Sequence, residues 1–309
     1  MQIAPISVPD DVRNWIRNVF AECNEAVAVK MTRVPTVHET SLDLTLIERL
    51  SAFSSPVRFE SEWLVRIDAH YLGGGRHFGQ WEIADIGLLV VFRRNGVIVR
   101  TKVGLLQSKR LYPDEQEFSE DEAVDYMIGF ARLMHPQSQE FLSVTSPRTF
   151  TFSGSSRYKA FHVGLMQFEI IQKYEARHGI PIHYLFYHPM RVPSRQVIPL
   201  SAVSEPKLVC EVGCRIISAK AVNESVGKFD NGYSPTYDDL RAIPSEATAG
   251  GKWPGWRLEQ FVVDRLMACH EGHTAVSESD EGLRQIFNRR SGPIAAAVAI
   301  TFDLPAQGG

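Results

Sequence analysis

The stretch LLQSKRLYP, residues 105–113, begins as an apolar strand and ends with polar and charged side chains. Side chains of a strand alternate between its two faces, so Leu105, Gln107 and Lys109 share one face. The opposite face carries mostly polar side chains, namely Arg100, Lys102, Ser108 and Arg110. Gln107 and Lys109 therefore interrupt the apolar face, while the other face is expected to be solvated.

The preceding run, EIADIGLLVVFRR (82–94), is a second apolar strand joined to the first by Asn95-Gly96. Asn-Gly between two apolar runs is a strong signal for a tight β-hairpin. Counted outward from this turn, Asp85 and Gln107 lie at nearly equal offsets, so we expect them opposite each other across a strand spacing of about 5 Å.

A third unusual residue precedes this hairpin, on the predicted helix 38–53, HETSLDLTLIERLSAF. Its apolar residues fall on one face at helical spacing: Leu42, Leu46, Ile47, Leu50 and Phe53. Glu39 projects near the middle of this face and Asp43 lies beside it. We expect this helix to cover the open end of the hairpin and bring Glu39 close to Asp85.

Each of these residues also has a simpler interpretation. Glu39 could simply be an acid in the first turn of its helix, where the positive end of the helix dipole favours a negative charge. Asp85 is equally a strand-end acid paired with a cation, and the strand carrying Gln107 and Lys109 could simply emerge into water.

Taken together, the same residues predict a site for a hard divalent cation, which prefers oxygen ligands. Asp85 and Glu39 supply carboxylates, and Gln107 supplies an amide oxygen. Lys109 cannot bind the metal, but its ammonium group can orient or deprotonate an attacking water or neutralise phosphate charge.

The remaining pattern predicts a mixed α/β chain. Further helices are expected at 11–30, 119–134, 158–177 and 255–270, and further strands at 61–72, 180–189 and 207–222. The run 293–304 is compatible with a final strand or a helix. The three strands at 61–72, 82–94 and 97–112 are expected to pair antiparallel. A boundary near residue 195 would separate a core, 1–195, from a C-terminal α+β region, 196–309, with a regulatory, dimerisation or substrate-recognition role.

Composition limits the class of protein. The chain has 309 residues, 44% hydrophobic and 22% charged, with a net charge of −3. This balance is typical of a globular protein and excludes a passive polycationic coat on nucleic acid. Four cysteines are too few for a disulfide scaffold, and neither a signal pattern nor a membrane-spanning run is evident. We expect a soluble cytoplasmic protein without a membrane partner.

The order of these residues resembles the PD-(D/E)xK nuclease superfamily, which has the restriction-endonuclease-like fold. Its core has an acid-bearing helix followed by three strands, with an Asp on the second strand and an acid-x-Lys on the third. Here the corresponding residues are Glu39, Asp85 and Gln107-Ser108-Lys109. Glutamine replaces the usual acid, as in a Q-x-K form similar to that of Mrr-type restriction endonucleases, and the proline before the Asp is absent from WEIAD.

The resemblance covers about residues 36–190 and implies an Mg²⁺-dependent or Mn²⁺-dependent endonuclease that hydrolyses phosphodiester bonds. DNA is the expected substrate in preference to RNA, with a role in defence against foreign DNA. A homodimer or a partner protein of a defence system is also implied. Cations on the third strand, Arg100, Lys102 and Arg110, would contact the substrate backbone.

Three alternatives remain. Loss of one acid at Gln107 is also consistent with a catalytically inactive nucleic-acid-binding or scaffold protein that kept the fold. A structural zinc site could be formed by Cys210, Cys214, Cys269 and His273, although a strand would hold the first two about 13 Å apart. Aromatic and cationic residues between 233 and 257 could stack on unpaired bases or form a small aromatic core: Tyr233, Tyr237, Lys252, Trp253, Trp256 and Arg257.

Overall fold

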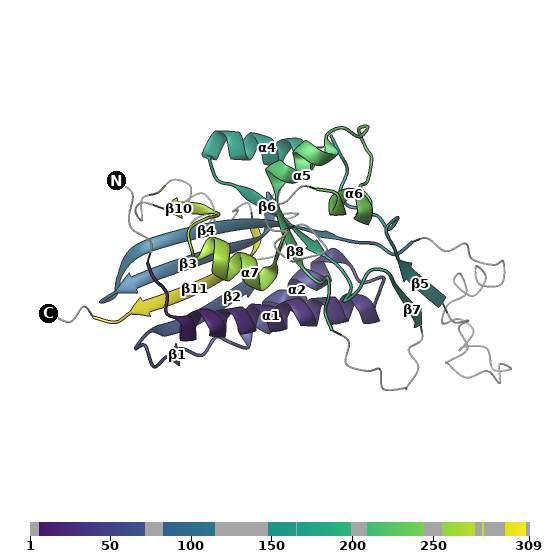
Figure 1. Ribbon diagram of the computed structural model, residues 1–309. Coiled ribbons are helices and arrows are strands. Elements are labelled where there is room, and N and C mark those ends of the chain that lie inside the picture. The colour runs from purple at the N-terminus through teal and green to yellow at the C-terminus, as the bar shows by residue number, and fades with distance from the viewer. Residues whose placement is uncertain are drawn as a thin grey trace, which may run out of the picture.

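The computed structural model describes most of the chain, namely residues 6–71, 83–114, 148–164, 166–198, 209–243, 255–275, 280 and 294–306. These residues form a mixed α/β fold with a large central sheet flanked by helices (Figure 1). The predicted helix 119–134 lies outside the described residues, as do Lys252 and Trp253.

Two helices open the chain as predicted. Helix α1, Asp10–Arg33, begins with two acids that suit a helix N-terminus and ends shortly before Pro35. Helix α2, Glu39–Ser51, buries four residues of the predicted apolar face, namely Leu42, Leu46, Ile47 and Leu50. Both helices pack on the same side of the sheet, α1 against α2 and α2 against strand β2 (Figure 1).

The predicted hairpin is confirmed. Strand β3, Ala84–Arg94, pairs antiparallel with strand β4, Val97–Arg110, through a turn at Asn95 and Gly96. Both turn residues have positive φ, 51° and 78°, the combination that Asn-Gly adopts readily in a two-residue hairpin. Ile86 pairs with Leu106, a register that carries Asp85 toward Gln107.

The central sheet contains nine strands in the order β1-β2-β11-β3-β4-β6-β8-β9, with β10 also paired to β4. The strands not yet introduced are β1 Val57–Arg58, β2 Leu64–Tyr71, β6 Ile182–Tyr187, β8 Arg215–Ser218, β9 Trp256–Arg257, β10 His273–Ala275 and β11 Ile294–Leu304. A separate two-stranded ribbon pairs β5, Arg148–Phe152, with β7, Ser194–Ile198.

The expected antiparallel arrangement of the first three strands is wrong in one respect. The C-terminal strand β11 lies between β2 and β3, antiparallel to β2 and parallel to β3. Strands β8 and β9 extend the same sheet beyond β6. The central sheet therefore contains strands from both sides of the expected boundary near residue 195, and β11 from the C-terminal side lies between two strands from the N-terminal side.

Two of the predicted helices are shorter than expected, namely α4 Met166–His178 and α7 Leu258–Gln260, the second continuing as a π-helical turn, Phe261–Leu266. Two further short helices, α5 Ala219–Val226 and α6 Tyr237–Arg241, were not predicted. The run 207–222 becomes strand β8 followed by helix α5, with the Ser218 hydroxyl accepting a hydrogen bond from the Ala221 amide. Among the described residues no helix combines the length and apolar character needed to cross a membrane.

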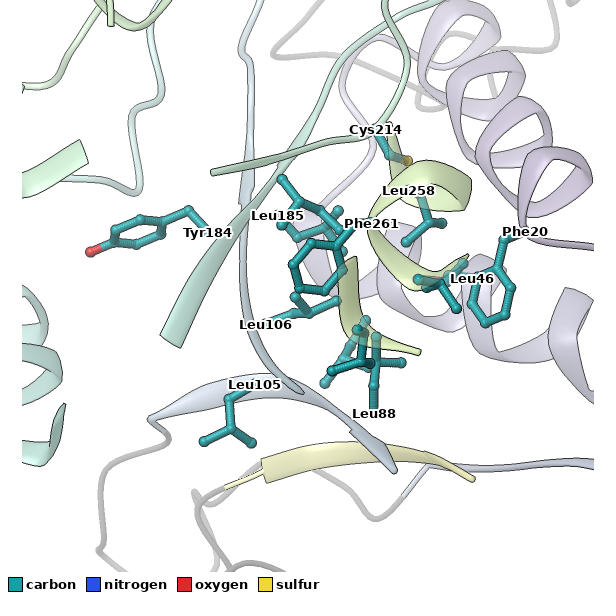
Figure 2. Packing of buried hydrophobic residues seen from close by; sticks show 14 of the residues in the cluster. Phe20, Leu46, Leu88, Leu105, Leu106, Tyr184, Leu185, Cys214, Leu258 and Phe261 are labelled. Carbon is teal, nitrogen blue, oxygen red and sulfur yellow. The ribbon is translucent and has the colours of Figure 1, made fainter. Parts of the chain in front are cut away.

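Adjacent residues of β4 point to opposite sides of the sheet. Figure 2 shows Leu106 directed toward Phe261, among side chains from α1, α2 and α7, while Leu105 points away from them. Every residue from Arg100 to Leu111 is buried, so both faces of this part of β4 are covered. The expected solvated face of β4 does not exist in this region.

The position of β11 predicts that the C-terminal strand and the hairpin unfold together. Phe302 is fully buried, stacks on Phe92 at 4.9 Å between ring centroids and lies 6.0 Å from the ring of Trp63. We expect Phe302→Ala to lower the free energy of unfolding by about 3–5 kcal/mol, in a single urea transition followed by circular dichroism.

Lys173→Ala is the control, because this side chain is 75% exposed, and it should change stability by less than about 0.5 kcal/mol. A Phe302→Ala protein that unfolds in two separate transitions, with the second unchanged, would contradict the shared core.

Candidate active site

The site forms where β4 extends beyond the start of β3. The ladder between the two strands ends near Ile86 and Leu106, so the next N–H groups on that side of β4 lack strand partners. Ser108 and Arg110 are two residues apart and their N–H groups point the same way. Ser108 N donates to Asp85 Oδ2 at 2.6 Å, and Arg110 N donates to Glu39 Oε2 at 2.9 Å. Two carboxylates thus replace the missing strand.

Asp85 and Gln107 are in direct contact, as their opposite offsets predicted. The Gln107 amide nitrogen Nε2 donates a hydrogen bond to Asp85 Oδ2. The amide oxygen Oε1 is buried and has no hydrogen-bond partner among the described residues. A buried carbonyl oxygen without a partner is uncommon and is a feature expected of a ligand-binding atom.

Glu39 and Lys109 form the second half of the site. Lys109 Nζ lies 3.6 Å from Glu39 Oε1 and donates to the backbone oxygen of Ser108 at 2.7 Å. Lys109 is 3% exposed, whereas the Glu39 side chain is 21% exposed. Both Glu39 oxygens are thus directed to β4, so Glu39 is more than the first-turn acid of the simpler interpretation.

A third acid, Asp43, lies one helical turn after Glu39 and is buried. Its Oδ1 accepts hydrogen bonds from Ser108 Oγ at 2.6 Å and from Tyr187 OH at 2.7 Å. Burial raises the pKa of Asp43 to about 7, while these two hydrogen bonds act in the opposite direction. The group links α2, β4 and β6.

The electrostatics of the cluster raise the pKa values of its two buried acids. Desolvation raises the pKa of Asp85 well above its ordinary value, and the neighbouring Asp43 carboxyl adds to this effect. Lys109 acts in the opposite direction, since its ammonium group stabilises the Asp85 carboxylate. Three carboxyl groups, Glu39, Asp43 and Asp85, thus lie around a single lysine ammonium group, and burial favours the protonated forms of Asp43 and Asp85.

The four predicted site residues, Glu39, Asp85, Gln107 and Lys109, are therefore brought together. As donors for Mg²⁺ or Mn²⁺ they fit in chemical type, since Asp85 offers a carboxylate and Gln107 an unpartnered amide oxygen. Across the part of the chain that the structure describes, no group of three His, Cys, Asp or Glu side chains has a metal-binding arrangement. Waters and substrate oxygens would supply the other ligands of Mg²⁺, which keeps several waters in most sites.

The predicted substrate-contacting cations have other roles. Arg110 is 1% exposed, and its guanidinium donates to the backbone oxygens of Val37, Pro35 and Leu111. Lys102 Nζ donates to the Gly272 oxygen and to Thr274 Oγ1, both at 3.1 Å. The expectation that these cations lie on a solvated face is wrong, because α2, its preceding loop and β10 cover it.

Arg100 is buried as well, at 5% exposure. With Lys102 at 2% and Arg110 at 1%, all three predicted substrate contacts are withdrawn from the surface. Burial lowers the pKa of Arg110 to about 10, but its guanidinium stays protonated at neutral pH. None of these side chains offers an exposed charge to a phosphate.

Sequence reasoning gave too little weight to Asp43 and missed Tyr187. The available signal was Asp43 itself, an acid beside Glu39 on a helix face otherwise lined with leucine and isoleucine. Tyr187 carried no such signal, because an aromatic residue in an apolar strand is ordinary. Only the parallel pairing of β6 with β4, Ser108 opposite Leu185 and Arg110 opposite Tyr187, brings its hydroxyl to Asp43.

The cysteines do not support the zinc alternative. Cys210 and Cys214 flank a turn at Gly213, φ +60°, and not the expected strand, so the separation expected of a strand does not apply to them. Among the described residues, however, no three His, Cys, Asp or Glu side chains are grouped so that they could hold a metal ion. All four cysteines are free thiols, and Cys269 Sγ donates weakly to the Met267 oxygen at 3.7 Å. Buried thiols are common in protein cores without a metal.

Comparison with known proteins gave no match: no protein-family model, curated protein or solved structure resembles this chain at a significant level.

The raised pKa of Asp43 predicts a pH-dependent stability difference. Between the ordinary value of 3.8 and about 7, the folded protein retains a proton on Asp43 that the unfolded chain releases. The contribution of this group to wild-type stability therefore falls as pH rises through that window. Asparagine does not titrate, so the stability of Asp43→Asn relative to wild type should increase from about pH 4 to about pH 7 and then level off.

Urea unfolding of both proteins at a series of pH values measures this difference. A stability difference that is constant with pH would show that Asp43 titrates normally in the folded protein. The Asp43 carboxyl also raises the pKa of Asp85, so the difference between the two curves includes the change in the Asp85 titration.

The hydrogen bonds of the buried Arg110 guanidinium predict that another positively charged side chain cannot take its place without loss of stability. Lysine has one compact ammonium group and cannot span the carbonyl oxygens of Pro35, Val37 and Leu111. We expect Arg110→Lys to lower the free energy of unfolding by about 2 kcal/mol or more. Arg66→Lys, at a side chain 49% exposed, is the control and should leave it nearly unchanged. Equal stability of Arg110→Lys and wild type would contradict a structural role for the guanidinium.

Proposed function

We propose that the protein is a Mg²⁺-dependent or Mn²⁺-dependent endonuclease that hydrolyses phosphodiester bonds, with DNA as substrate in preference to RNA. The observation that carries the proposal is that four consecutive residues of β4, 107–110, contact acids from two other segments, Asp85 and Glu39. An acid on a helix, an acid on a strand and a lysine on the paired strand thus converge, as in the nuclease superfamily that the sequence resembles.

The order of elements also supports a restriction-endonuclease-like core. Helix α2 precedes β2, the β3–β4 hairpin follows, and β6 lies parallel to β4 after helix α4. The departure is strand β11, which separates β2 from β3. This insertion leaves the hairpin that carries Asp85, Gln107 and Lys109 unaltered.

The metal, when bound, would supply Lewis acidity and a water of lowered pKa for attack on phosphorus. Asp85 and Gln107 would hold it. The Gln107 amide now turns its nitrogen toward Asp85, and rotation of the last side-chain bond would turn its oxygen there instead, beside the Asp85 carboxylate, as a second ligand. Glu39 would add a carboxylate directly or through a water.

Lys109 would act on the reacting groups and not on the metal. Its position 3.6 Å from Glu39 keeps the ammonium group near the more exposed side of the site. There it can orient the attacking water and stabilise the negative charge that develops on the phosphate. Glu39 holds the lysine in place through this ion pair.

A role in defence against foreign DNA, alone, as a homodimer or with a partner protein, is suggested by the resemblance to restriction endonucleases. A second candidate function is that of a catalytically inactive nucleic-acid-binding or scaffold protein. It is favoured by the burial of Gln107 and Lys109 and by the hydrogen bond that Gln107 donates to Asp85.

The test is degradation of plasmid DNA and of single-stranded circular DNA with Mg²⁺ or Mn²⁺, with EDTA as the metal-free condition. We expect wild type to cut only with metal, and Lys109→Met to reduce the rate at least about 100-fold, the effect typical of a positioned proton-transfer group.

Lys102→Met is the matched control, because Lys102 is also a buried lysine of β4 but hydrogen-bonds to Gly272 and Thr274 instead of facing Glu39. It should retain activity once folding is verified by circular dichroism. Equal cutting by wild type and Lys109→Met, or no cutting by folded wild type with either metal, would refute the nuclease assignment.

A further inference from the structure

A surface beside the candidate active site carries cations and aromatic rings in alternation. We define it as the strip: Tyr112, Arg157, Lys159, Lys228, Phe229 and Tyr233. It begins two residues after Arg110, whose N–H group holds Glu39. The Arg110 guanidinium lies 4.1 Å from the centroid of the Tyr112 ring, so the strip is in contact with the site.

Each cation of the strip lies over one of its aromatic rings. The distances to the ring centroid are 5.1 Å from Arg157 to Tyr233, 5.9 Å from Lys159 to Tyr112 and 5.4 Å from Lys228 to Phe229. Arg157, Lys159 and Lys228 are exposed. The ring faces attract these positive groups and limit their motion, which prepares them to meet an anion at low entropic cost.

Backbone hydrogen bonds join the segments that carry the strip. Tyr112 N donates to the Arg157 oxygen at 2.9 Å, and Val163 N donates to the Tyr233 oxygen at 3.0 Å. The Arg157 guanidinium donates to the Ser234 oxygen at 2.7 Å. The strip is therefore held together although its residues come from three parts of the chain.

Two of the acids next to the strip are engaged locally. Asp114 accepts hydrogen bonds from the hydroxyls of Ser153 and Ser156, at 2.7 and 2.8 Å. Asp239 accepts from the Tyr233 hydroxyl at 2.8 Å and caps helix α6. Asp230 is exposed beside Phe229, so the strip is distinguished by the placement of its three cations over aromatic rings and not by an excess of positive charge.

The depth of the site indicates which form of nucleic acid fits. Gln107 and Lys109 are 2% and 3% exposed, so a reacting phosphate must reach side chains that lie below the surface. The backbone of a regular duplex is held at the surface of a stiff cylinder, whereas a single strand can bend into a recess. Cations interleaved with aromatic rings are also the usual composition of single-strand binding surfaces.

We propose that the strip binds a single strand of nucleic acid and directs it into the site between Glu39 and Asp85. The inference rests on the proposed function, which it extends by naming the substrate as single-stranded. Arg157, Lys159 and Lys228 contact successive phosphates, and the rings of Tyr112, Phe229 and Tyr233 lie beside the bases.

Binding is tested by fluorescence anisotropy of a labelled single-stranded oligodeoxynucleotide and of the matching duplex, in EDTA so that no cleavage occurs. We expect wild type to bind the single strand more tightly. The double variant Arg157→Gln, Lys159→Gln should bind it at least about tenfold more weakly at moderate salt. The slope of log affinity against log salt should also become shallower by about 0.7 for each phosphate contact removed.

Arg58→Gln is the matched control, because Arg58 is an exposed cation on β1, the edge strand opposite the strip. It should bind as wild type does. The inference is overturned if the double variant retains wild-type affinity and salt slope, or if wild type binds the duplex at least as tightly as the single strand.

The same measurements separate this inference from the proposed function. Strip-dependent binding by a protein that cuts no nucleic acid would support the strip and refute the nuclease. Metal-dependent cutting that needs Lys109 but is unaffected in the double variant would support the nuclease and refute the strip.

Discussion

The site depends on a mismatch in length between two paired strands. Strand β4 continues past the start of β3, which leaves the N–H groups of Ser108 and Arg110 without strand partners in a buried region. A buried N–H group without a partner costs about 1–3 kcal/mol. The carboxylates of Asp85 and Glu39 remove that cost, so their positions are fixed by the backbone of β4 and not by flexible loops.

These hydrogen bonds give the acids a structural role that is compatible with the proposed catalytic one. A carboxylate that accepts one backbone hydrogen bond still has lone pairs for another ligand, and pre-positioning lowers the cost of binding it. The orphaned oxygen of Gln107 and the excess of carboxyl groups over ammonium groups are what a purely structural cluster would avoid. Both features are reconciled if a divalent cation is a normal occupant of the site.

The C-terminal part of the chain is integral to this arrangement. Strand β11 supplies the neighbour that β3 would otherwise have found in β2, and Phe302 on it packs on Phe92 of β3. Strand β10 and the adjoining loop cover Lys102 on β4. The strand bearing Asp85 is thus held from one side by the hairpin and from the other by residues more than 200 positions later in the sequence.

The sequence by itself determined the local elements and their internal geometry. Helical spacing fixed α1 and α2, and Asn95-Gly96 fixed the hairpin and with it the opposition of Asp85 and Gln107. The position of Glu39 over the open end of the hairpin was also expected, because the apolar stripe of α2 had to face the sheet, but its ion pair with Lys109 was not. Periodicity and turn chemistry act over a few residues, so a sequence displays them directly.

Only the tertiary structure decided the place of β11, the burial of Arg100, Lys102 and Arg110, and the link from Asp43 to Tyr187. Pairing between distant strands leaves no local signature, because an apolar strand is compatible with many neighbours. Whether a charged strand face meets water depends on what packs over it, and here the covering elements are α2 with its preceding loop and β10. The fate of a charged residue is therefore set by segments far from it in the chain.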